Sequence, residues 1–277
     1  MKRLLALLLA LALLLGLCSA GALAEEADGI PAGSRVAFPA PEGWTILQIN
    51  PEDNASLAAI KGGEDASAFL FCPYITVMFM PHGTMVLDAR EFTDSSEDIE
   101  PFSLGGYDWT GYSYESMGMA GISLTSRGDF GTIVVMLVTK PMLGGDDSEP
   151  LTLADPDVQE IISGIRVQAT VEADWVVFNE DGSVTVQLPG REGYSWGQGG
   201  TGNFVLQEGD PFPECEVEEE VGADAYTARI TMQGDGVISC SFSLFNDEET
   251  AMVAGVSILC RDGKAVSLTD AYLRDGE

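Results

Sequence analysis

The chain's single histidine, His82, is the first residue to test for chemistry, because imidazole is the side chain whose charge changes near neutral pH. It stands between a proline and a glycine, which is typical of a turn. A catalytic Ser–His–Asp or Cys–His arrangement needs a nucleophile beside the histidine, and the preceding cysteine, Cys72, falls in an apolar stretch. The acidic pair Asp146-Asp147 lies in a polar, glycine-containing segment typical of a solvated loop. The sequence therefore predicts no catalytic residues and a protein that is not an enzyme.

The spacings that hold metals, phosphates or cofactors are also missing from the sequence. One histidine cannot form a zinc site of the usual kind, and the cysteines include no Cys-x-x-Cys pair. Residues 197–202 are rich in glycine but contain no Lys-Ser/Thr step, so they do not match a phosphate-binding loop. We therefore expect no metal and no cofactor.

Two of the cysteines fall in the regular alternation of predicted strands. Cys240 is in phase with Ile238 and Phe242, and Cys260 is in phase with Ile258. Because side chains two residues apart share one face of a strand, both cysteines should point into the same core. The pattern slightly favours a disulfide between Cys240 and Cys260, which an exported protein permits. Free cysteines that act as small hydrophobic residues remain the alternative.

The first residues have the layout of a secretory leader. Lys2 and Arg3 give a positive start, an unbroken apolar run follows, and Ala22-Leu23-Ala24 is a small-x-small cleavage site. We expect a signal peptide over residues 1–24 and a secreted or cell-surface location in a bacterium. The alternatives are a retained N-terminal anchor or a lipoprotein signal at Cys18. No later segment has the length and apolarity of a membrane span, so we expect none in the mature chain.

The charge of the chain limits the classes of partner that it can bind. Its 44 acidic and 13 basic residues give a formal net charge of −31. Such a charge repels the phosphates of nucleic acids and of anionic membrane surfaces. We therefore expect no nucleic-acid partner, and another protein or a component of the cell envelope instead.

A short predicted helix divides the chain into two β-rich domains. Asp155 is a good N-cap and Pro156 suits the first helical position. Apolar residues then follow at i, i+3, i+4 and i+7, namely Val158, Ile161, Ile162 and Ile165. We expect an α+β first domain over residues 30–167, an antiparallel sheet closed by this helix. The short strands and glycine-rich turns of residues 169–277 predict an all-β immunoglobulin-like sandwich.

The order of pieces in the first domain resembles a known family. Val36-Ala37-Phe38-Pro39, then Pro41-Glu42-Gly43-Trp44, a strand-rich middle and the last helix look like the PsbP/Mog1-like α/β sandwich domains of exported bacterial proteins. That resemblance implies a compact binding or assembly module without catalytic residues. It carries no individual site residue over to this chain.

One loop of the second domain resembles chagasin-type cysteine-protease inhibitors, an immunoglobulin-like family. That family has Asn-Pro-x-Thr-Gly-Tyr-x-Trp between its second and third strands, and this chain has Pro189, Gly193, Tyr194 and Trp196 at matching positions. The asparagine position holds a leucine, and the loop is longer. The resemblance implies that these four residues bind a protease. The alternative is that Tyr194 and Trp196 anchor the loop onto the sandwich, as buried aromatic residues usually do.

A later segment departs from the inhibitor pattern. Where the family carries a second, aromatic inhibitory loop, this chain has Asn246-Asp247-Glu248-Glu249, which has no apolar side chain to insert into a protease. We therefore expect an exported, non-catalytic binding or assembly module at the bacterial cell surface. The alternative is a cysteine-protease inhibitor that acts through the Gly193–Trp196 loop.

Overall fold

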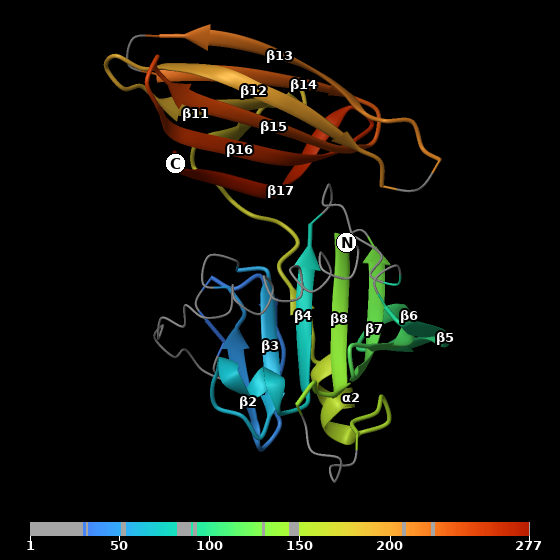
Figure 1. Cartoon of the computed structure of the whole chain (residues 1–277). Coiled ribbons are helices and arrows are strands. Elements are labelled where there is room, and N and C mark those ends of the chain that lie inside the picture. Colours follow the sequence, from blue (N-terminus) through green and yellow to red (C-terminus); the bar gives the residue numbers. More distant parts are fainter. Residues whose placement is uncertain are drawn as a thin grey trace. The chain divides into compact units, whose positions relative to one another are not determined.

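The structure is a computed structural model that describes residues 30–276 except 32, 51–53, 82–89, 91–92, 129–130, 144–149, 207–208 and 223–224. The predicted signal peptide at residues 1–24 and His82 both lie outside the described residues. The chain divides into two compact units, and the boundary between them falls between Gln168 and Ala169. Figure 1 labels helix α2 and most strands of both units.

The first unit is built on one seven-stranded antiparallel sheet with the strand order β2-β3-β4-β8-β7-β6-β5. In that order its strands are β2 (Trp44–Gln48), β3 (Ser56–Lys61), β4 (Tyr74–Met80), β8 (Gly131–Lys140), β7 (Met119–Gly128), β6 (Tyr107–Ser116) and β5 (Ser95–Leu104). A small ladder joins β1 (Val36–Ala37) to β9 (Arg166–Val167), and a 3-10 turn, η3 (Ala66–Leu70), precedes β4.

The middle of this sheet is apolar on both faces. In β8 the consecutive residues Ile133, Val134 and Val135 are all buried. In β4 the buried residues alternate with partly buried ones. Because a strand buried on both faces cannot show a clean apolar–polar alternation, these two strands mark the centre of the sheet.

The helix predicted after Asp155 is present as α2 (Pro156–Ser163), and its apolar stripe is buried. On its outer side, the Asp157 carboxylate accepts hydrogen bonds from Trp44 Nε1 at 3.0 Å and from Lys61 Nζ at 3.1 Å. These two hydrogen bonds hold the pKa of Asp157 below its ordinary value. The helix is therefore tied to strands β2 and β3 as well as seated on the core.

The prediction of an α+β fold is wrong, because the described part of the chain is mainly β. Strands make up 60% of the residues that the structure describes and helices 6%, and α2 is the one α-helix among them. Helix α2 has eight residues, whereas the sheet that it contacts has seven strands. A clear helical stripe in the sequence thus identified a real element that is too small to set the fold class.

The second unit is a sandwich of two four-stranded antiparallel sheets, with the orders β10-β11-β14-β13 and β12-β15-β16-β17. Its strands are β10 (Val176–Phe178), β11 (Val184–Pro189), β12 (Ser195–Phe204), β13 (Glu214–Val221), β14 (Ala225–Gln233), β15 (Gly236–Phe245), β16 (Thr250–Arg261) and β17 (Lys264–Asp275).

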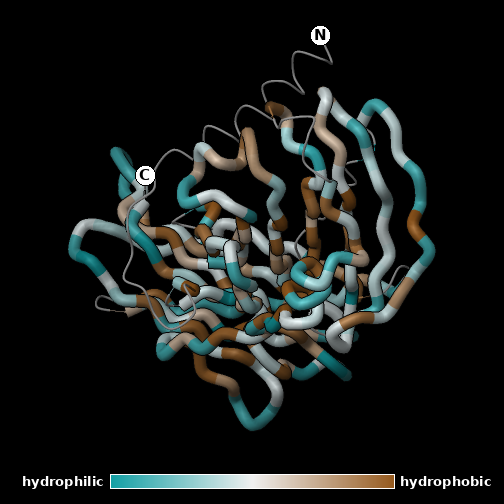
Figure 2. Tube along the Cα trace, turned by 90° about the horizontal axis from the view of Figure 1, so that it is seen from below, coloured by the Kyte–Doolittle hydropathy of each residue, from teal (hydrophilic) through white to brown (hydrophobic). Residues whose placement is uncertain are grey.

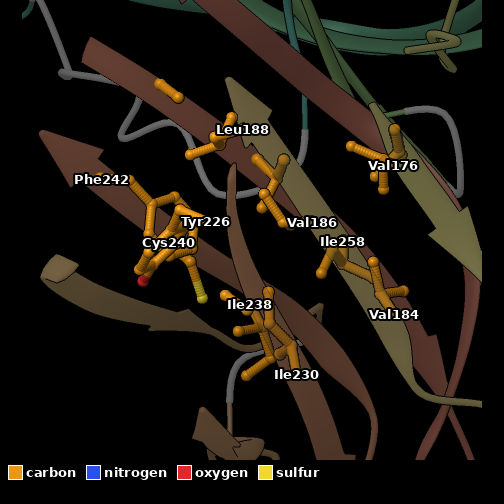
Figure 3. Close-up of a cluster of buried hydrophobic side chains, with 14 of the residues drawn as sticks. Val176, Val184, Val186, Leu188, Tyr226, Ile230, Ile238, Cys240, Phe242 and Ile258 are labelled. Carbon is orange, nitrogen blue, oxygen red and sulfur yellow. The ribbon is translucent and has the colours of Figure 1, made fainter. Parts of the chain in front are cut away.

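One apolar core lies between the two sheets of the sandwich (Figure 3). It is formed by alternate residues, as in β15, where Ile238, Cys240, Phe242 and Leu244 are buried and the residues between them are not fully buried. Figure 2 shows the consequence along the chain, where hydrophobic segments are repeatedly interrupted by polar ones. Such interruption is expected when each strand buries a single face.

Among the residues that the structure describes, no helix has the length and apolar character needed to cross a bilayer.

Candidate functional site

Two loops lie side by side at one end of the sandwich. The first joins β11 to β12, and the second joins β15 to β16. Because Ser195 at the start of β12 pairs with Phe245 at the end of β15, the two loops leave the sheet at the same place. We call the surface formed by Pro189, Arg191, Tyr194, Phe245 and Glu249 the loop end.

The side chains of Tyr194 and Glu249 tie the two loops together. The Tyr194 hydroxyl donates a hydrogen bond to Glu249 Oε1, and the Arg191 guanidinium lies over the tyrosine ring, 4.4 Å from its centre. The hydrogen bond to Glu249 raises the pKa of the Tyr194 hydroxyl above its ordinary value. The tyrosine therefore fixes the geometry between the loops, with its ring half-buried.

The second loop is also held by hydrogen bonds of its own. Asn246 Oδ1 accepts hydrogen bonds from the backbone N–H groups of Glu248 and Glu249, at 2.8 and 2.9 Å. This arrangement turns the chain locally and leaves the side chains of Asp247, Glu248 and Glu249 in solvent. The loop end thus carries a fixed cluster of negative charge beside the Tyr194 ring.

Trp196, which the sequence placed among the candidate binding residues, lies inside the sandwich. Its side chain is only 6% exposed, and its ring stands 6.2 Å from that of Tyr226. Trp196 Nε1 donates a hydrogen bond to the Pro189 carbonyl at 2.7 Å. The indole therefore anchors the end of β11 to the start of β12, and it is not available to a partner.

The other two predicted residues shape the turn. Pro189 is the exposed last residue of β11. Gly193 has a φ of +81°, a conformation that residues with a Cβ adopt only at a cost. The structure therefore places all four predicted residues at this loop, where they hold its conformation and do not form a row of exposed contacts.

The sequence did not predict two exposed apolar residues at this end of the sandwich. Phe245 is 46% exposed, and Val221 at the end of β13 is 63% exposed. Phe245 is out of phase with the inward residues of β15, and this parity is the signal that could have found it. Nothing in the sequence alone could have placed Val221 at the same end, since that depends on which strands are neighbours.

The structure does not bring Cys240 and Cys260 together. Cys240 pairs with Val256 on the neighbouring strand, and Cys260 pairs with Gly236. The two cysteines are thus offset by four positions along the ladder, or about 13 Å, which exceeds the reach of a disulfide. All four cysteines among the described residues are free thiols.

The part of the chain that the structure describes contains no group of three or more histidine, cysteine, aspartate or glutamate residues that could hold a metal ion. A shallow hollow near the turns of the second unit is lined by three acidic residues, but one of them is already engaged. Asp235 Oδ1 accepts a hydrogen bond from the backbone N–H of Asp262 at 2.6 Å. Because His82 lies outside the described residues, the expectation that the chain is not an enzyme stays a prediction.

Comparisons of the chain with protein-family models, with curated proteins and with solved structures find no match. The resemblances to PsbP/Mog1-like and chagasin-like domains therefore stay predictions that rest on sequence pattern.

Proposed function

We propose that the chain is an exported, non-catalytic binding or assembly module at the bacterial cell surface, and that it contacts a protein partner through the loop end. The observation that carries this proposal is the exposed Phe245 ring beside two loops that the Tyr194–Glu249 hydrogen bond holds together. Aromatic residues and arginine are enriched at the centres of protein interfaces, and the loop end supplies both.

Rigidity is the second reason to favour this surface. Binding costs free energy when mobile loops become ordered, so loops that are already fixed bind more tightly for the same contacts. Here Trp196 anchors the first loop from inside, and Asn246 closes the second with its own hydrogen bonds. The strand order also supports the proposal, because it is the order of an immunoglobulin constant-type sandwich with β17 added, and loops at the ends of such sandwiches serve binding.

Edge strand β13 is a poorer candidate than the loop end. Strand β13 is the edge of its sheet, and its sequence is Glu-Cys-Glu-Val-Glu-Glu-Glu-Val. Charged side chains along an edge strand oppose the addition of another strand. A partner that pairs with this backbone would have to overcome that repulsion, so we favour the loop end over this edge.

The charges near Phe245 indicate what the partner presents. Asp247, Glu248 and Glu249 are exposed beside the ring, and the whole chain carries a net charge of −31. Such a surface attracts an apolar pocket with a basic rim and accelerates its approach at low salt. The partner in this proposal is therefore an envelope protein with a basic binding face.

The experiment is a capture of partners from the producer's envelope extract with the full chain, at several salt concentrations. The variant Phe245→Ser should reduce recovery of the partner by about tenfold or more, since the loss of a central aromatic contact costs about 2 kcal/mol. Phe178→Ser is the matched control. Phe178 is 43% exposed, but it pairs with the start of β11, at the opposite end of that strand. Equal recovery by both variants, or no specific partner at any salt concentration, would contradict the proposal.

A cysteine-protease inhibitor is the second candidate, and the Tyr194–Glu249 contact is the observation that favours it. This contact makes one continuous edge of the two loops, as an inhibitor that fills a protease cleft requires. The buried Trp196 weighs against it, because only Phe245 and Tyr194 are left to enter the cleft. Titration of papain-like enzymes with the full chain tests this candidate, and absence of inhibition at micromolar protein would remove it.

A further inference from the structure

Strand β17 is an edge of its sheet, and only its first half is covered by other segments of the chain (Figure 1). In that half the pairing with β16 has two irregularities. The outer side is already in use there, because Ala265 N–H donates a hydrogen bond to the Gly182 carbonyl at 2.9 Å and Val171 N–H donates one to the Leu268 carbonyl at 3.0 Å. The second half, residues 270–275, pairs with β16 in regular register.

The backbone of this second half has hydrogen-bonding groups that point away from β16. Gly276 N–H donates a hydrogen bond to the Ala251 carbonyl of β16 at 2.9 Å. Residues of an antiparallel strand face a given neighbour alternately, so the N–H and C=O groups of Ala271, Leu273 and Asp275 face the other way. Within the described part of the chain, no residue forms a hydrogen bond with these outward groups. They are a template on which a further strand can pair.

The other edges of the three large sheets each have a feature that opposes such pairing. Strands β2 and β10 are short, with five and three residues. Strand β5 contains a proline and an irregularity in its register, β12 also has an irregularity, and β13 is rich in glutamate. Short strands, proline, bulges and charge are the means by which proteins keep edge strands from associating. Residues 270–275 have no proline, no bulge and no run of like charge.

We propose that two copies of the chain associate through this half of β17, antiparallel and about a two-fold axis, so that two four-stranded sheets become one. Hydrogen bonding requires that outward residues of one copy lie opposite outward residues of the other. With Ala271 opposite Leu273 of the second copy, and Leu273 opposite its Ala271, each pair exchanges both of its N–H···O bonds. Tyr272 then lies opposite its own equivalent. The inference goes beyond the proposed function and does not rest on it.

The charges of the segment are complementary to themselves in this register. Arg274 and Tyr272 are exposed on the outer face of the sheet, with the guanidinium 5.2 Å from the centre of the ring. Asp270 shares this face, because side chains two residues apart point the same way. The pairing sets Asp270 of each copy opposite Arg274 of the other. Opposite charges that face each other across a strand pair stabilise it, whereas like charges destabilise it.

The neighbouring registers that keep outward residues opposed lose this match. If Leu273 faced its own equivalent, neither charge would face an opposite one. If Ala271 faced its own equivalent, the second copy would run past Leu268, where Val171 already occupies the edge. Backbone direction, charge and the covered first half of β17 therefore favour the same register.

The association should be weak and reversible, because an interface formed by residues 270–274 alone is small and such interfaces belong to transient complexes. Both copies are strongly acidic, so the measurements use about 0.15 M salt, which screens repulsion beyond about 8 Å. The protein used is the chain from Glu25, which lacks the apolar leader predicted over residues 1–24 and keeps both units intact.

The first test is sedimentation over a concentration series up to about 1 mM. We expect a monomer–dimer equilibrium in the wild-type chain. Ala271→Pro removes an outward N–H group and leaves the ladder with β16 complete, which is where an edge strand tolerates proline. It should raise the dissociation constant of the dimer by about tenfold or more. A wild-type chain that stays monomeric, or a folded Ala271→Pro variant that dimerises as tightly as wild type, would overturn the proposal.

Charge exchange tests the register and does not need the proline variant to fold. Arg274→Asp sets two aspartates opposite one another, Asp270→Arg sets two arginines opposite one another, and each change alone should weaken the dimer by about tenfold. An equal mixture of the two variants should associate as tightly as wild type, since every charge again faces an opposite one. Lys264→Asp makes the same change of charge at the other end of β17 and is the matched control. Equal weakening by Lys264→Asp, or no recovery in the mixture, would contradict the register.

A cross-link locates the axis. The Cα atoms of facing residues that do not share hydrogen bonds lie about 4.5 Å apart, within the range of a disulfide. Under mild oxidation, Tyr272→Cys should therefore give a linked dimer whose joined peptides both contain position 272. Arg274→Cys is equally exposed in the native chain but faces position 270, so it should not link to itself. No link in Tyr272→Cys, or as much link in Arg274→Cys, would show that Tyr272 does not lie on the axis.

Discussion

Replacement of Trp196 by alanine distinguishes the two roles considered for this residue, an anchor in the core and an exposed contact for a partner. If the indole is a core anchor, its removal leaves a large cavity between the sheets, and Trp→Ala substitutions at such sites cost about 3–5 kcal/mol of unfolding free energy. The Pro189 carbonyl also loses its donor, which adds about 1 kcal/mol. If the indole were instead an exposed contact for a partner, the cost would stay within about 0.5 kcal/mol.

Urea unfolding of the full chain measures this cost when hydrogen exchange is read peptide by peptide, so that each unit reports separately. With a slope of about 1.5 kcal/mol per molar urea for a unit of this size, the summed cost should lower the midpoint of the second unit by about 3–4 M. The first unit should be unaffected, because every contact given above for Trp196 lies within the second unit. Trp196→Phe keeps most of the ring and loses the N–H donor, so its cost should be about 1–2 kcal/mol.

The control is Phe245→Ala, an aromatic truncation at the same end of the sandwich. Because this ring is 46% exposed, its loss should cost less than about 1 kcal/mol. A midpoint for Trp196→Ala no lower than that for Phe245→Ala would mean that the indole does not belong to the core. That result would return Trp196 to the candidate contact residues.

Three further predictions concern pKa values and close packing. The depressed pKa of Asp157 contributes stability that is complete above the unfolded value of about 3.9 and is lost as the pH falls through the lower folded value. In acid-unfolding curves, Asp157→Asn should therefore be less stable than wild type at pH 7 and should lose less stability on acidification. Glu249→Gln should lower the pKa of Tyr194 toward its ordinary value, which NMR titration of labelled tyrosines would show. Gly105→Ala should destabilise the first unit by about 2–3 kcal/mol in urea, because the φ of Gly105 is +68° and a Cβ would lie 2.7 Å from the backbone of α2. Gly106 also has a positive φ, +86°, but a Cβ there would have no neighbour within 4 Å, so Gly106→Ala should cost only about 1 kcal/mol.

Local signals in the sequence predicted helix α2 well. Its apolar stripe, its N-cap position and its proline all act within a few residues, so no knowledge of the fold was needed. The fold class was wrong because several strands carry no such signal. In β5 (Ser95–Leu104) most residues are exposed, and β12 begins Ser-Trp-Gly-Gln-Gly-Gly. These segments are strands because a neighbouring strand supplies their hydrogen bonds, which composition does not reveal.

The candidate site, too, could be predicted from the sequence only in part. The sequence identified the loop that carries Tyr194 and Trp196, since aromatic residues beside glycine and proline stand out in a β-rich region. It could not tell that one ring points into the core and the other toward Glu249. The partner of Tyr194 lies 55 positions away along the chain and is brought near only by the pairing of β12 with β15. Side-chain direction and contacts at this loop therefore depend on topology.

The cysteines show most clearly that a sequence can predict where a side chain points without predicting which residue it meets. Alternation along β15 and β16 indicated that Cys240 and Cys260 both point inward, and both are buried. Two inward residues on adjacent strands can bond only if the register sets them opposite one another, and here the register sets a valine opposite Cys240.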